Sequence, residues 1–128
     1  MIEIRWSEKI NDIGLRGTLQ SLQDIRQSIL RLLQTDEVQI SISANVDFDP
    51  APYSSLLSFL TIRKGIGSTK VAVATEHLEV TGNSDCLARF AEYFDFDGSE
   101  VNCHCHFDYY EGNEWIVPDS LPLVISVR

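Results

Sequence analysis

Residues 18–34 read TLQSLQDIRQSILRLLQ, and they form the clearest helical pattern in the chain. Apolar side chains recur there at spacings of three and four, which places them on one face of a helix. These side chains are Leu19, Leu22, Ile25, Ile29, Leu32 and Leu33. Thr18 and Ser21 are both suited to cap the N-terminus. The stretch therefore predicts an amphipathic helix, whose apolar face needs another element to cover it.

The segments around this helix predict strands and one more helix. Apolar and polar side chains alternate in residues 2–6 and 37–46, as in a half-buried strand. Further strands are expected at residues 55–64, 70–80, 101–110 and 121–127, separated by a proline-containing loop at 47–52 and a turn at 65–68. The stretch that contains Gly14 and Gly17 is expected to be a polar connection. Residues 85–95 predict the second helix, because Leu87, Phe90, Ala91 and Phe94 share one helical face.

The resulting order is β-α-β-β-β-α-β-β, which indicates the α+β class. We expect one domain over residues 1–128, with about six strands in an antiparallel or mixed sheet and both helices on one of its faces. A chain of 128 residues can bury a core of its own without a metal or disulfide. Its apolar runs are short of the roughly 20 residues that span a bilayer. Its first residues lack the pattern of a signal peptide, so a cytoplasmic location is expected.

The stretch NCHCHFD, residues 102–108, holds two of the three cysteines and two of the three histidines. If it is a strand, Cys103 and Cys105 point to one face and His104 and His106 to the other. The cysteines are then expected to be reduced and buried, and the histidines to face solvent or a partner. The alternative is a metal-binding protein or metal-dependent enzyme, in which His77 joins His104 and His106 around one ion.

Other catalytic signatures are weak. Loop aspartates beside Pro and Gly, such as Asp47, Asp49, Asp95 and Asp97, are more typical of turns than of paired acid–base groups. Residues 65–68, GIGS, lack the lysine and the helix that follow a phosphate-binding loop. We therefore expect no enzyme and no cofactor.

Charge and aromatic content set the last third of the chain apart. The net charge is −9, which argues against nucleic acid or an anionic membrane as the partner. Between Phe90 and Val127 there are eight carboxylates, eight of the twelve aromatic residues, and no Lys or Arg. One interpretation is that these residues cover the core and keep the protein soluble. The other is a binding surface for a basic protein.

The tail HCHFDYYEGNEWIVPDSLPLVISV, residues 104–127, resembles the C-terminal pattern of bacterial polymorphic-toxin immunity proteins, of the type called immunity protein thirty-two. The resemblance is carried by His104, His106, Asp108, Tyr109, Trp115, Pro118, Asp119, Ser120 and the segment from Pro122 to Val124. It implies a small cytoplasmic protein that binds a cognate toxin and occludes its active site.

The sequence thus predicts a non-enzymatic module whose partner is a basic toxin domain. The candidate partner-binding residues are His104, His106, Asp108, Tyr109, Tyr110, Glu111, Glu114, Trp115 and Asp119. Homo-oligomers are a further expectation that stays open, because an open sheet leaves an edge strand that can pair with a second copy.

Overall fold

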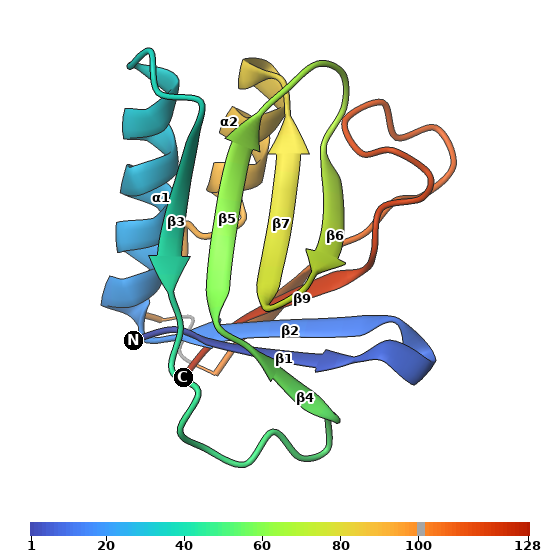
Figure 1. Ribbon diagram of the computed structural model, residues 1–128. Helices are drawn as coiled ribbons and strands as arrows, with labels where there is room; N and C mark the ends of the chain where they lie inside the picture. The colour runs from blue at the N-terminus through green and yellow to red at the C-terminus, as the bar shows by residue number, and fades with distance from the viewer. Residues whose placement is uncertain (100–101) are drawn as a thin grey trace.

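The computed structural model describes residues 1–99 and 102–128, and it has the α+β architecture expected from the sequence (Figure 1). One mixed sheet contains β1 (Glu3–Ser7), β2 (Asp12–Gly17), β4 (Ser55–Leu57), β8 (His104–Phe107) and β9 (Leu123–Val127). The other contains β3 (Gln39–Ser43), β5 (Phe59–Lys64), β6 (Lys70–Ala74) and β7 (His77–Gly82). The helices are α1 (Leu19–Leu33) and α2 (Ser84–Glu92), and a short 3-10 helix, η1 (Glu8–Ile10), joins β1 to β2.

Each sheet is built around one parallel pair of strands. The five-stranded sheet has the order β4-β1-β2-β9-β8, in which β2 and β9 are parallel and the other neighbours are antiparallel. The four-stranded sheet has the order β3-β5-β7-β6, in which β5 and β7 are parallel. Figure 1 shows the strands of the five-stranded sheet running across the lower end of the other sheet.

Both predicted helices are confirmed, and polar side chains cap them. The hydroxyl of Thr18 accepts a hydrogen bond from the backbone N–H of Ser21 at 3.1 Å, and the Asn83 side chain accepts one from Cys86 at 2.9 Å. The apolar faces are buried as the spacing requires: Leu22, Ile25, Ile29 and Leu32 on α1, and Leu87, Phe90 and Ala91 on α2. In the described part of the chain, no helix is long and apolar enough to cross a membrane.

The expectation of a single sheet was wrong because two predicted strands divide. Residues 55–64 form β4 and β5, which belong to different sheets, and the backbone leaves one sheet for the other at Ser58. The N–H of Ser58 donates to the carbonyl of Glu76 at 2.8 Å. Residues 70–80 form the hairpin of β6 and β7, and Thr75 turns the chain with a φ of 56°. No glycine or proline marks either break.

The strand β2 was missed altogether. It contains Gly14 and Gly17, which indicated a connection, yet Ile13 and Leu15 are fully buried. The side of Gly14 that would carry a Cβ faces the Tyr53 ring, whose hydroxyl lies 2.9 Å from an ideal Cβ position. The glycine therefore serves close packing within the sheet and not a turn.

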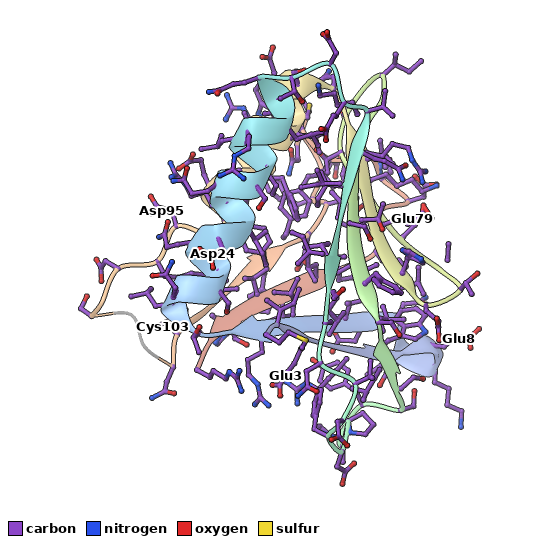
Figure 2. All side chains as sticks on the ribbon, turned by 60° about the vertical axis from the view of Figure 1, so that its left-hand side comes forward. Glu3, Glu8, Asp24, Glu79, Asp95 and Cys103 are labelled. Atoms are coloured by element: carbon purple, nitrogen blue, oxygen red, sulfur yellow. The ribbon has the colours of Figure 1, made fainter. Side chains whose placement is uncertain are left out.

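The two sheets and both helices share one hydrophobic core. Figure 2 shows α1 packed beside one face of the four-stranded sheet, with the five-stranded sheet below. Phe90 of α2 joins the layers, because its ring contacts Phe107 of β8 with centroids 4.9 Å apart. The long connection between β8 and β9 runs beside the edge strand β6 (Figure 1).

Candidate functional site

Residues 108–119, here called the acidic loop, follow β8 and carry most of the predicted partner-binding side chains. The loop is tied to the edge strand β6. The N–H of Thr69 donates to the carbonyl of Trp115 at 2.8 Å, and the N–H of Val117 donates to the carbonyl of Thr69 at 2.9 Å. Just beyond the loop, the Ser120 hydroxyl accepts a bond from the N–H of Val71 at 2.8 Å. These bonds give the loop a defined backbone, although it is not regular secondary structure.

The aromatic side chains of the acidic loop have different environments. Ile116 is buried and anchors the loop, whereas Tyr110 is 67% exposed and Trp115 is 39% exposed. The Arg89 guanidinium of α2 lies 3.5 Å from the centroid of the Trp115 ring, a cation–π contact that holds one ring face against the helix. Tyr109 is half-buried against the core and is not a free contact residue.

A cavity of about 350 Å³ opens between α2 and the acidic loop. Its aromatic wall consists of Tyr93, Phe107, Tyr110 and Trp115. Burial, together with the neighbouring Cys105 and Tyr110, raises the pKa of Tyr93, so this phenol stays neutral and can donate a hydrogen bond at ordinary pH. A concave aromatic surface with a few polar groups suits an inserted side chain.

The carboxylates in the acidic last third of the chain are of two kinds. Glu92 pairs with Arg26 at 3.1 Å, and Asp119 pairs with Lys70 at 3.0 Å. Hydrogen bonding to Lys70 lowers the pKa of Asp119. Within residues 1–99 and 102–128, neither Glu111 nor Glu114 forms an ion pair, so their charge is available to a partner. The structure thus brings cations from earlier segments to part of the acidic third and leaves the loop tip uncompensated.

The three histidines do not come together. His104 and His106 lie on the exposed face of β8 with ring centroids 5.2 Å apart, and His106 Nδ1 is 3.9 Å from Asp108 Oδ2. His77 belongs to the other sheet, where its Nδ1 is 2.7 Å from the hydroxyl of Thr61 and its ring stacks on Phe59. Among the described residues, no group of three His, Cys, Asp or Glu side chains could hold a metal ion. The geometry therefore does not favour the metal-binding alternative.

The cysteines correct one expectation. Cys86 is buried and Cys105 is half-buried, but Cys103 is exposed, and no disulfide joins any of the three. Cys103 precedes the start of β8, at a point beyond the end of α2, so neither helix covers it. Val101, the first residue of the strand predicted at 101–110, lies outside the described residues, as does Glu100.

Of the nine predicted partner-binding residues, the structure places Tyr110 and Trp115 on the cavity beside α2, and Glu111 and Glu114 are their neighbours in the chain. Asp119 is at the far end of the acidic loop, against β6, and His104, His106 and Asp108 continue the surface onto β8. Two contributors were missed, Arg89 and Tyr93. Arg89 lies on α2 and Tyr93 is the residue that caps its C-terminus, four positions later, so both side chains lie on one face. The sequence does show this spacing.

Comparison with known proteins adds no relative to this description: no family model, no curated protein and no solved structure matches the chain.

Proposed function

We propose that this protein is a non-enzymatic binding module, an immunity protein that binds and neutralises a basic toxin domain in the cytoplasm. The observation that carries the proposal is the acidic loop, where exposed Tyr110 and Trp115 flank a cavity and Glu111 and Glu114 lie outside any ion pair of the described residues. Large aromatic anchors beside uncompensated carboxylates are what a cationic protein surface can bind.

The support of the loop backbone favours binding further. Because backbone hydrogen bonds with Thr69 hold the loop beside β6, and Arg89 packs on the Trp115 ring, the loop backbone and this ring lose less freedom on association. The carboxylates attract a cationic surface at longer range and accelerate the encounter. A toxin that acts on a polyanion such as nucleic acid needs a basic substrate surface, and an acidic loop seated there would exclude the substrate.

Purification of the tagged full-length protein from its native host tests the proposal. We expect it to recover a protein with a basic toxin domain, encoded beside this one. The toxicity of the recovered partner should be suppressed when it is expressed together with this protein. A purification that yields no basic partner, together with the absence of a toxin gene nearby, would contradict the proposal.

The surface itself is tested by a combined Glu111→Gln, Glu114→Gln and Trp115→Ala variant. Loss of an aromatic hot spot costs about 2 kcal/mol or more, so the dissociation constant should rise about thirtyfold or more while the fold is kept. The matched control is Glu8→Gln with Glu76→Gln, two exposed carboxylates away from the loop. Equal affinity for both variants, measured by calorimetry, would exclude this surface.

A further inference from the structure

The two sheets have four edges, and three of them are protected against pairing. The acidic loop covers β6, since Thr69 exchanges hydrogen bonds with Trp115 and Val117. β4 is only three residues long and follows the proline-containing loop. The edge strand β8 carries two histidines and is followed by Asp108. Short edges, covered edges and edges with ionisable side chains are the usual protections.

The remaining edge, that of β3, has none of these protections. Its sequence, QISIS over Gln39–Ser43, contains no charge and no proline. Ile40 and Ile42 point toward the core but are only partly buried, whereas their counterparts Ile62 and Leu60 on β5 are fully buried. An added strand would complete the burial of both isoleucines.

Backbone hydrogen bonds show which groups of β3 face outward. The carbonyl of Val38 accepts from Lys64, and the N–H of Ala44 donates to Ser58, so even-numbered residues bond toward β5. Gln39, Ser41 and Ser43 therefore direct their N–H and C=O groups to the outer edge, because the direction alternates along a strand. The next odd-numbered residue, Asn45, confirms this direction, since its N–H donates outward to the carbonyl of Ile2 at 2.7 Å. Asn45 is therefore paired on its outer side, whereas β3 remains the edge strand of its sheet.

A groove runs beside this edge, between β3 and α1. It consists of two cavities of about 350 and about 230 Å³, which meet at Ser28 and Ile42. Leu32 and Ile40 line the first cavity, and Ile25 lines the second. Ile40 and Ile42 are two positions apart on β3 and point to the same face. The two cavities beside them could therefore each hold one side chain, i and i+2, of a strand that pairs with β3.

We propose that this groove binds an extended, uncharged segment of a partner protein, which adds to β3 as a fifth strand and places apolar side chains at alternate positions under α1. Charge favours this occupant. The groove walls carry only Asp24, Arg31 and Glu37 as charged side chains, in a chain of net charge −9. A basic segment would be drawn more strongly to the acidic loop. The inference is independent of the proposed toxin-binding surface.

A second copy of this chain fits the groove less well. Figure 1 shows α1 beyond the outer edge of β3 and not behind β5. If β3 paired with β3 of another copy, the two α1 helices would meet above the shared edge, where helices need about 8–10 Å between their axes. The occupant is therefore a separate strand without a helix of its own at that position.

Random peptides displayed on phage and selected against the full-length protein provide the probe. We expect enriched peptides with apolar residues at i and i+2 and no charge between them. In the free protein, the amide of Ser41 should exchange rapidly with solvent, and those of Ile40 and Ile42 slowly. A bound synthetic peptide should protect the Ser41 amide, as measured by NMR hydrogen exchange.

Substitutions on α1 separate the groove from the rest of the surface. Ser28→Arg fills the junction of the two cavities and should weaken peptide binding about tenfold or more. Gln27→Arg adds the same charge at an exposed neighbouring position and should leave binding unchanged. If Ser28→Arg unfolds the protein, Ser41→Pro removes one outward N–H without touching the pairing with β5. The proposal is overturned if no alternating peptide is enriched, or if binding leaves Ser41 unprotected.

Discussion

Among the described residues, Glu3 is the only buried charged side chain, and two arginines lie beside it. Arg16 Nε donates a hydrogen bond to Glu3 Oε1 at 2.9 Å, and Arg16 Nη2 lies 2.8 Å from the same oxygen. Arg128 Nη1 lies 3.7 Å from Glu3 Oε2. The two arginines are partly exposed, so water still solvates their outer sides. This geometry links β1, β2 and the end of β9 on the outer face of the five-stranded sheet.

Replacing Glu3 by alanine should lower the free energy of unfolding by about 2 kcal/mol, because two guanidinium groups lose their shared carboxylate. The exposure of the arginines keeps the loss below that of a fully buried pair. Chemical denaturation measures the change. Glu8→Ala, at an exposed carboxylate in η1, should change stability by less than about 0.5 kcal/mol. Equal effects of the two substitutions would contradict a structural role for Glu3.

The pair of Asp119 and Lys70 gives a prediction for pH. Since Lys70 lowers the pKa of Asp119, the carboxylate favours the folded state above its unfolded pKa of about 3.9, and this contribution is lost as pH falls through the lower folded pKa. In an NMR titration, the pKa of Asp119 should lie below the ordinary aspartate value of about 3.9. The substitution Lys70→Gln should raise this pKa. Asp97 is the internal control, because the Ser99 hydroxyl and not Lys70 lowers its pKa. The pKa of Asp97 should therefore be the same in the wild type and in the Lys70→Gln variant. An unchanged Asp119 midpoint would refute the pairing.

At the scale of elements, a β-bulge begins β8. Asn102 and Cys103 together face Val127: the N–H of Asn102 donates to the Val127 carbonyl at 3.1 Å, and the N–H of Val127 donates to the Cys103 carbonyl at 3.0 Å. Asn102 has a φ of 70°, the left-handed conformation of the first residue in a G1 bulge. The bulge precedes the register that directs His104 and His106 outward and Phe107 into the core.

Asn102→Gly should be neutral or raise the free energy of unfolding by up to about 1 kcal/mol, because glycine adopts this φ without strain. Asn102→Val should lower it by about 1–2 kcal/mol, since a β-branched side chain is strained there. Ser126→Val, on the neighbouring strand β9, controls for the added apolar side chain. Thermal unfolding distinguishes the three. A valine as stable as glycine at position 102 would argue against the left-handed conformation.

At the scale of the whole molecule, Phe90 connects α2 to both sheets. It is fully buried, and its ring makes edge contacts with Phe94 at 5.2 Å and with Phe107 at 4.9 Å. The helix that carries it packs against β7, and Phe107 belongs to β8 of the other sheet. The two sheets therefore depend on one shared core and should unfold together.

Phe90→Ala should lower the free energy of unfolding by about 3–5 kcal/mol, because it removes a ring from a closed core. Phe48→Ala, in the half-buried loop after β3, should cost distinctly less. Circular dichroism and tryptophan fluorescence should give coincident unfolding curves for the wild type. Separate transitions would show that the two sheets unfold as independent units.

The candidate site was predicted in part. Charge and aromatic content drew attention to Tyr110, Glu111, Glu114 and Trp115, and the structure places two of them, Tyr110 and Trp115, on one cavity. The contributions of Arg89 and Tyr93 could not be read from the loop itself, because α2 brings them from another segment. The pairing of Asp119 with Lys70 joins residues that are far apart in the chain, so local patterns carry no trace of it.

The sequence by itself determined both helices, their caps, the α+β class and the outward direction of the two histidines, because helical spacing and strand alternation are local properties. Only the tertiary structure decided that the strands form two sheets, that β2 is a strand and that Cys103 is exposed. Ser58 and Thr75 redirect the chain without a glycine or proline, and Gly14 packs under Tyr53. Such features depend on what each segment meets across the core, and no short window of sequence contains that information.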